Sequence, residues 1–151
     1  MNKPSTAQPR MPRLDGQLCF ALYSTGLAMT KIYRKVLKPL DVTYPQYLVL
    51  LVLWEHERLS VSDIGKHLFL DSATLTPLLK RLEAADLVAR TRSSEDERQV
   101  DVSLTKKGRA LQSIAPEIQQ AIADATHCSD TELNRLRKDL AVLRRRLSEN
   151  E

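Results

Sequence analysis

Two cysteines are the residues of this chain with the most distinctive chemistry. Cys19 and Cys128 lie 109 positions apart, and no secretory hydrophobic segment precedes them, so the disulfide scaffold of a secreted protein is not expected. A reducing, cytoplasmic location is expected instead, where a thiolate can attack an oxidant. The alternative for each cysteine is a structural or incidental thiol.

Other reactive arrangements are not found in the sequence. The three histidines, His56, His67 and His127, share no metal-ligand spacing with the cysteines, so zinc binding is a weak alternative and no metal is expected. The sequence contains no glycine-rich phosphate loop and no Ser/His/Asp arrangement, and no cofactor is expected. The one enzymatic interpretation left is a thiol peroxidase that uses Cys19.

The composition is that of one ordinary globular domain. Of 151 residues, 42% are hydrophobic and 28% are charged, and the net charge of +4 permits an acidic partner without requiring one. The longest apolar run, residues 47–54, is far shorter than the ~20 residues that span a bilayer, so no membrane segment is expected. Residues 1–13 are polar, contain three prolines and are predicted to form a disordered arm. Its basic side chains either touch phosphates or only keep the chain soluble.

Helical periodicity and capping signals predict the elements that position these residues. Apolar spacing predicts a long first helix from Leu14 to just before Pro39, with Asp15 as its cap. The first cysteine is therefore expected near the positive end of a helix dipole, which favours a thiolate. Thr43 and Gln46 form a capping-box pair at the start of a second helix, whose run at residues 48–54 is apolar all round and so buried.

The stretch that follows is typical of a helix-turn-helix. Ser60 can cap a short helix that ends near Leu68, and a second helix is predicted from Asp71 to Ala84 after a tight connection. One face of that second helix is apolar, and the other combines small and basic side chains, which suits entry into a DNA groove. A merely solvated face is the alternative. The candidates for base or phosphate contact are Thr74, Thr76 and Lys80, and those for phosphate contact are Ser72 and Arg81.

Pro77 complicates the start of this helix. In a helix capped at Asp71, the proline removes the hydrogen bond to the Ala73 carbonyl. Two possibilities stay open: the helix begins later, near Thr74, or it bends.

A β-hairpin is predicted directly after this helix. Residues 87–92 and 99–104 are short β-like runs, and a polar connection without glycine or proline joins them. A helix, turn, helix and hairpin in this order make a winged helix. Eight basic residues face six acidic ones over residues 80–109. The wing is therefore expected to contact DNA through Arg92 and through Arg98, which should reach a minor groove.

Two further helices are predicted after the hairpin. Thr105 can cap one, with a kink at Pro116, and Ser129 with Glu132 can cap the last. Leucines of the last helix alternate at spacings of three and four, which is a coiled-coil seam that requires a partner. That partner is either a folded-back helix of the same chain or a second subunit, which the long terminal helices favour.

The predicted fold class is therefore mainly α with a small β-hairpin. A winged helix-turn-helix is expected over residues 43–104. A helical dimerisation region is expected over residues 14–40 and 105–148, so that the two parts form one intertwined domain.

Several segments resemble a known family. Asp96-Glu97-Arg98, followed by VSLTKKG at residues 102–108, resembles the wing motif of MarR-family transcription regulators, and the predicted helix order agrees with that family. LDGQLCFALY at residues 14–23 and TYPQYL at residues 43–48 resemble its organic-hydroperoxide-sensing branch. The resemblance covers the whole chain except the N-terminal arm.

This resemblance implies roles for individual residues. In that branch, organic peroxide oxidises a cysteine at the position of Cys19, and tyrosines at the positions of Tyr33 and Tyr44 from the other subunit contact its sulfur. A two-cysteine subgroup has a resolving cysteine late in the chain, which Cys128 resembles, and joins the two as an intersubunit disulfide. From the residues alone, the site of Cys128 just before a helix cap leaves it mobile enough to resolve a sulfenic acid.

Helix geometry constrains the role of the tyrosines. Tyr33 lies fourteen residues after Cys19, which in one continuous helix is about 21 Å at ~1.5 Å per residue. If both residues serve one site, a second chain must supply the tyrosine. Packing in the core or at an interface is the alternative for all the tyrosines.

The resulting hypothesis is a homodimeric repressor, not an enzyme, that binds a pseudo-palindromic operator in double-stranded DNA. Organic hydroperoxide is the expected inducer, which oxidises Cys19 and releases the operator. The alternatives are a repressor of the same fold released by a small anionic or phenolic ligand, and the thiol peroxidase.

Overall fold

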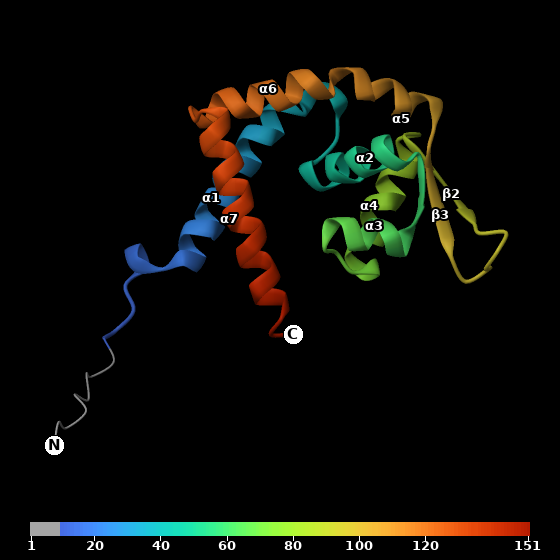
Figure 1. The fold of residues 1–151 in the computed structure, drawn as a ribbon. Helices are drawn as coiled ribbons and strands as arrows, with labels where there is room; N and C mark the ends of the chain where they lie inside the picture. The colour runs from blue at the N-terminus through green and yellow to red at the C-terminus, as the bar shows by residue number, and fades with distance from the viewer. Residues whose placement is uncertain (1–9) are drawn as a thin grey trace.

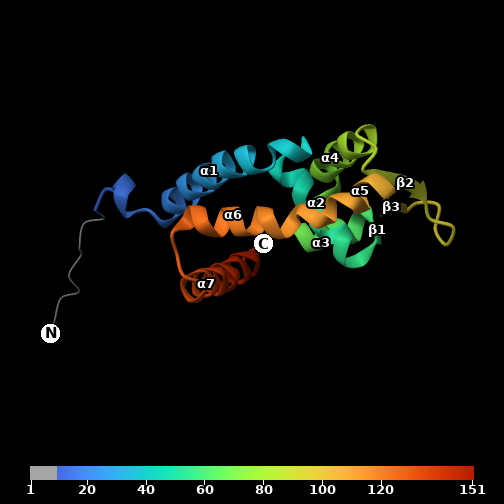
Figure 2. The same cartoon turned by 90° about the horizontal axis from the view of Figure 1, so that it is seen from above.

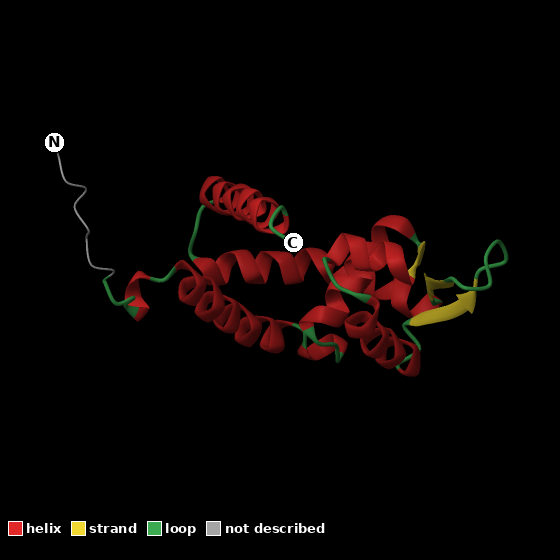
Figure 3. Ribbon diagram, turned by 90° about the horizontal axis from the view of Figure 1, so that it is seen from below, coloured by secondary structure: helices red, strands yellow, loops and turns green. Residues whose placement is uncertain are grey.

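The computed structural model describes residues 10–151, so residues 1–9 of the predicted arm lie outside the described residues. The chain is mainly helical (Figure 1), with its strands confined to one end (Figure 3), and the predicted winged-helix fold class is confirmed. The helices are α1 (Leu18–Val36), α2 (Tyr44–His56), α3 (Val61–Leu68), α4 (Ser72–Ala84), α5 (Lys106–Ala110), α6 (Ala115–Thr126) and α7 (Asp130–Ser148), and the strands are β1 (Arg58–Ser60), β2 (Val88–Arg92) and β3 (Val100–Leu104).

The first helix starts later than its apolar spacing predicts. α1 begins at Leu18, and its N-cap residue is Gln17, whose side chain makes no capping bond. The prediction that Asp15 caps this helix is wrong. Asp15 lies in a separate 3-10 turn, Leu14–Gly16, where its carboxylate pairs with Arg13 at 3.2 Å.

Three other helices start where their capping residues predict. The Thr43 hydroxyl accepts a hydrogen bond from the Gln46 amide at 3.4 Å, and Gln46 Oε1 accepts one from the Thr43 amide at 2.9 Å, which completes the capping box of α2. The hydroxyls of Ser60 and Ser129 likewise cap α3 and α7. These starts are encoded locally, because each cap satisfies backbone amides of its own first turn.

α4 begins at Ser72 despite its internal proline. The Asp71 side chain caps it by accepting a hydrogen bond from the Thr74 amide at 2.7 Å. The possible late start near Thr74 is therefore wrong. Pro77 lies within the helix and leaves the Ala73 carbonyl without its usual partner.

The predicted hairpin is present and is part of a three-stranded sheet. β2 and β3 pair antiparallel, with Val88 opposite Leu104 and Arg92 opposite Val100. β1 pairs with the other edge of β3, so the strand order is β1-β3-β2. Sequence reasoning does not predict β1, because three residues are too few for a periodicity signal.

The helix predicted to run from Thr105 past Pro116 is two helices. Thr105 caps α5, and a 3-10 turn, Leu111–Ile114, separates α5 from α6. Pro116 lies in the first turn of α6, where its missing N–H costs nothing. The expected kink is thus a break.

The chain has two hydrophobic cores. The winged-helix core joins α2, α3, α4 and the sheet, and it includes Leu50 and Leu53. The helices α1, α6 and α7 are called the helical arm here, as distinct from residues 1–13. The second core, the arm core, joins the C-terminal half of α1 to α2 and α6, and it includes Tyr47 and Ile118. Figure 2 shows α1 and α6 extending away from the winged part, with α6 between α1 and α7 in that view. No described helix is long and apolar enough to cross a membrane.

Candidate DNA-binding face and cysteine site

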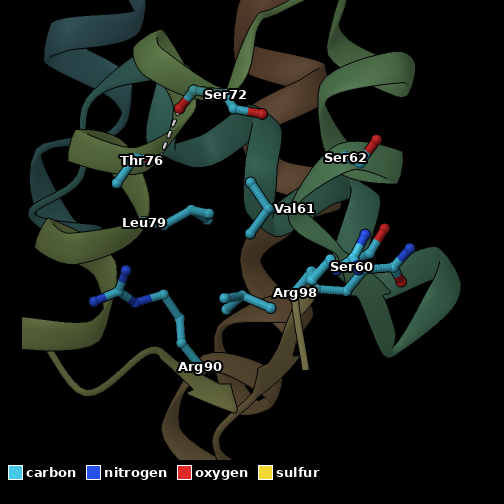
Figure 4. A pocket seen from close by; sticks show the side chains of 10 residues that line it. Ser60, Val61, Ser62, Ser72, Thr76, Leu79, Arg90 and Arg98 are labelled. Atoms are coloured by element: carbon cyan, nitrogen blue, oxygen red, sulfur yellow. Dashed lines mark hydrogen bonds between the residues drawn. The ribbon is translucent and has the colours of Figure 1, made fainter. Parts of the chain in front are cut away.

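The outer face of α4 carries most of the residues predicted to contact DNA. Ser72, Thr74, Lys80 and Arg81 are exposed. Thr76 is half-buried, and its hydroxyl donates to the Ser72 carbonyl at 2.7 Å (Figure 4). Because the leucine stripe on the opposite side is buried in the winged-helix core, α4 presents a polar and basic face outward.

A groove of about 320 Å³ lies between α4, the start of α3 and the base of the wing. Figure 4 shows Thr76 and Leu79 on its α4 side, Val61 on its α3 side and Arg90 at the wing. The elements predicted to meet DNA therefore border one concave surface.

Arg90 is held by an acid at the end of α4. Its Nε donates to Glu83 Oε2 at 3.0 Å and its Nη2 donates to Glu83 Oε1 at 3.3 Å. The Arg90 amide also donates to Glu83 Oε2, at 3.2 Å. These hydrogen bonds hold the pKa of Glu83 below its ordinary value of 4.5. The pair fastens the last turn of α4 to β2, a link that sequence reasoning does not predict.

The other wing arginines are available to an outside partner. Arg92 and Arg98 are exposed, and neither forms an ion pair within residues 10–151. Asp96 Oδ1 accepts a hydrogen bond from the Arg98 amide at 3.0 Å, and the Asp96 carbonyl accepts one from the Gln99 amide at 2.9 Å. Asp96 thus shapes the turn that presents Arg98.

Cys19 lies at the exposed end of a long helix. It is the second residue of α1, its thiol is free, and its side chain is exposed. α1 continues without a break to Val36, so the condition for a separation of about 21 Å between Cys19 and Tyr33 is met. The two residues cannot meet within one chain.

Tyr33 and Tyr44 do meet. Their rings stack with centroids 4.1 Å apart, and burial raises the pKa of Tyr33 to about 12. The Tyr33 phenol therefore keeps its proton at neutral pH and remains a hydrogen-bond donor. Both rings line a largely apolar hollow of about 660 Å³ that runs along α1 past Leu22 and Leu27.

Cys128 lies at the break between α6 and α7. Its thiol is free and half-buried, and Sγ lies 3.4 Å from the Thr126 carbonyl. The Cys128 amide donates to the Thr126 hydroxyl at 3.2 Å, and His127 before it has a left-handed backbone, with φ of 54°. The site is irregular chain between two helices, as the sequence predicts.

Two helices have uncovered apolar faces. On α1, Leu18 is 58% exposed, and on α7, Leu136, Leu140 and Leu147 are 51%, 46% and 59% exposed. The leucine seam of α7 is therefore not closed by a folded-back helix within the described part of the chain. Large uncovered apolar faces of this kind mark interaction sites.

Comparisons with known proteins identify the family. Residues 31–114 match the model for the SarA/Rot transcriptional regulators. Over 131 residues the sequence is 48% identical to the organic hydroperoxide resistance transcriptional regulator of Bacillus subtilis, and the match covers 87% of this chain and 89% of that protein. The chain belongs to the MarR/SarA family of transcriptional regulators. Its relatives there are regulators and not enzymes.

This MarR/SarA regulator is similar to solved structures of AbfR from Staphylococcus epidermidis in reduced, overoxidised and disulfide-formed states. Reduced AbfR bound to DNA is 38% identical, with a TM-score of 0.76 over 91% of this chain and 94% of that one. Disulfide-formed AbfR is 39% identical, but its TM-score is 0.60 over 91% of each chain. Overoxidised AbfR bound to DNA has a TM-score of 0.73. The fold is therefore more similar to the two DNA-bound forms than to the disulfide form.

Sequence reasoning assigns no role to Trp54, the one tryptophan of the regulator. The structure places it against both cores, with its indole N–H donating to the Gly108 carbonyl at 3.0 Å. A buried indole N–H needs an acceptor. The acceptor lies 54 positions away in the chain, so no local sequence signal identifies it.

Proposed function

We propose that this regulator is a homodimeric repressor that leaves its operator when an organic hydroperoxide oxidises Cys19. The observation that carries the proposal is the exposed cysteine at the start of one unbroken helix, about 21 Å from the stacked tyrosine pair of its own chain. The uncovered face of α1 is the surface on which a second chain can bring its tyrosines to this cysteine. The site is then complete only in the dimer.

In this proposal, each α4 enters a major groove of a pseudo-palindromic operator and each wing lies along the adjacent minor groove. Thr74, Thr76 and Lys80 contact bases or phosphates, Ser72 and Arg81 contact phosphates, and Arg92 and Arg98 act from the wing. All of these residues except the half-buried Thr76 are exposed, and Arg92 and Arg98 form no ion pair within residues 10–151, which supports this assignment. The similarity to reduced AbfR bound to DNA supports it further.

The apolar faces of α1 and α7 form the proposed dimer interface, over residues 14–40 and 105–148. A symmetric dimer presents the same leucines from both chains, so that each uncovered seam covers its copy. The repressor then reads its operator with two winged helices, whose spacing the helical arms set.

The proposed chemistry begins at the sulfur of Cys19. Its thiolate attacks the outer oxygen of the hydroperoxide, and an S–O bond forms as the O–O bond breaks. The leaving alkoxide takes a proton and departs as an alcohol, so Cys19 is oxidised to a sulfenic acid and the peroxide is reduced. Tyr33 of the partner subunit, which keeps its phenolic proton, donates a hydrogen bond to the reacting sulfur.

Cys128 of the partner subunit is the proposed resolving residue. Its sulfur attacks that of the sulfenic acid, the disulfide forms, and the hydroxyl leaves as water with the thiol proton. The position of Cys128 between two helices lets it move without unfolding either of them. The disulfide then shifts α1 and changes the spacing of the two winged helices.

Operator release tests this function. In a fluorescence-anisotropy assay, cumene hydroperoxide should weaken operator binding by the wild type at least about tenfold, and a thiol reductant should restore it. Cys19→Ser should stay bound under the same conditions, and Cys128→Ser should lose the covalent dimer band on a non-reducing gel. Release that persists in Cys19→Ser refutes the redox mechanism and favours control by a small ligand.

A peroxidase is the remaining alternative. It would consume peroxide catalytically with thiol turnover and show no salt-dependent, sequence-selective DNA binding. Selective operator binding that weakens with salt therefore supports the repressor.

A further inference from the structure

We infer that Trp54 transmits to the wing the structural change that oxidation of Cys19 causes, because Trp54 links the tyrosine pair to the start of α5. The inference rests on the proposed function, because the signal is the oxidation of Cys19 next to that pair. Its basis is a continuous line of contacts from the arm core to the connection between α4 and β2.

The first part of this line is aromatic. Tyr33 stacks on Tyr44 and lies 6.3 Å from Tyr47, measured between ring centroids. Tyr47 is 3% exposed and meets Trp54 edge to face, at 5.9 Å and 74°. Tyr47 is buried between the tyrosine pair and Trp54, and buried side chains pack with little free volume. A shift of the pair toward Tyr47 therefore moves Trp54 or repacks the rings between them.

The second part is a hydrogen bond with a fixed direction. The Trp54 indole N–H donates to the Gly108 carbonyl at 3.0 Å. Gly108 is buried so tightly that a Cβ there would collide with the Leu87 carbonyl. Next to it, the Thr105 hydroxyl donates to the Asp86 carbonyl at 2.6 Å and the Thr105 amide donates to the Leu87 carbonyl at 3.1 Å. The start of α5 is thus bonded to the segment that joins α4 to the wing.

Trp54 differs from the other residues that bridge the two cores. Val42 and Leu111 also pack against both, but their contacts are apolar and allow sliding. A hydrogen bond weakens steeply when its angle changes. Trp54 is therefore the bridging residue that fixes the position of the wing base relative to the arm core, and it acts as a positioning residue rather than as part of either site.

Trp54→Phe tests the link, because it keeps a ring but removes the N–H donor. We expect the reduced variant to bind operator within about twofold of the wild type and Cys19 to be oxidised at the wild-type rate, measured by dimedone labelling. Release by cumene hydroperoxide should be about threefold to tenfold smaller, which is the effect of one neutral hydrogen bond. The matched control is Val52→Ala, a truncation on α2 at a residue that packs on the winged-helix core alone; it should be released like the wild type.

Each outcome decides a different point. The inference is overturned if peroxide releases Trp54→Phe from the operator as it releases the wild type. It is also overturned if the substitution lowers the operator affinity of the reduced and the oxidised protein by the same factor. Release in Cys19→Ser overturns the proposed function instead. If Trp54→Phe does not fold, the wild type still decides, because Trp54 is the only tryptophan and reports its own surroundings. Peroxide should shift its fluorescence emission in the wild type but not in Cys19→Ser, and unchanged emission after complete oxidation of Cys19 overturns the inference.

Discussion

The winged part and the helical arm of this regulator differ in how much of their apolar surface a single chain buries. Leu50 and Leu53 of the winged-helix core are 0% exposed, whereas Leu18 and Leu147 of the arm are 58% and 59% exposed. Both regions are built from helices with apolar faces. The winged part buries those faces against its own sheet and helices, and the arm leaves them open. One chain is thus sufficient to bury the core of the winged helix-turn-helix. The uncovered apolar faces of the helical arm indicate that a second copy of the chain covers them.

The difference suits the proposed sensor. In the proposed dimer, a self-contained winged part keeps its shape when the helical arms move, so a change at the interface would alter the spacing of the two winged helices without unfolding either. The stacked Tyr33 and Tyr44 lie at the junction, where the arm core meets α2. In the proposed mechanism, a change at the tyrosine pair therefore arises directly beside the winged part whose position it alters.

The largest expected effect is in the winged-helix core. Leu53→Ala should lower the free energy of unfolding by about 2–5 kcal/mol, because it leaves a cavity where no solvent reaches. Urea unfolding of the reduced protein measures it. A cost below about 1 kcal/mol would show that this core is not closed.

A smaller effect is expected in the arm, and on association rather than folding. Leu140→Ala removes a half-exposed side chain that occurs twice in a symmetric interface, so it should cost about 1 kcal/mol per copy and raise the dimer dissociation constant about thirtyfold. Sedimentation analysis measures this constant. Lys138→Ala, off the leucine seam of α7, is the control and should leave it unchanged. An unchanged constant in Leu140→Ala would place the interface elsewhere.

The smallest effect concerns the link between α4 and the wing. Glu83→Gln should weaken operator binding about threefold, although it removes a negative charge near DNA, because Arg90 loses its ionic partner. Glu97→Gln, an exposed acid of the wing loop, is the control and should bind equally or more tightly. Tighter binding by Glu83→Gln would mean that the pair has no positioning role.

The same pair has a pH dependence with a definite sign. The folded-state pKa of Glu83 lies below its ordinary value of 4.5, so the pair contributes fully above that value and is lost as the pH falls through the folded pKa. The contribution of the pair to the free energy of unfolding should therefore decrease as the pH falls below about 4.5 in the wild type and be absent from Glu83→Gln. Urea unfolding of both proteins over this pH range measures the difference, and an equal pH dependence in the two would contradict it.

The features that the sequence predicts well are those with local causes. The starts of α2, α3 and α7 follow from Thr43, Ser60 and Ser129, because a capping hydroxyl acts on its own first turn. The prediction from Asp15 is wrong because an acid before an apolar run can equally lie inside a separate 3-10 turn, as it does here, with its carboxylate paired to Arg13. The exposure of the arm leucines is consistent with the seam pattern that predicts a partner.

The features that escape prediction depend on distant contacts. β1 exists only because β3 offers it an edge. The pairing of Arg90 with Glu83 requires a turn of the chain to bring β2 back to α4. The Trp54 to Gly108 hydrogen bond spans 54 positions. No periodicity or cap encodes such contacts, since they arise when finished elements pack together.

The most direct test of the account asks whether the cysteine site is built across two chains. Heterodimers that combine one Cys19→Ser chain with one Tyr33→Phe chain contain a single Cys19, which faces the intact Tyr33 of the partner subunit if the site is shared. Dimedone labelling during cumene hydroperoxide treatment should then show that cysteine reacting at the wild-type rate. A wild-type chain paired with a doubly substituted Cys19→Ser, Tyr33→Phe chain should react more slowly. The reverse order of the two rates would contradict the shared site.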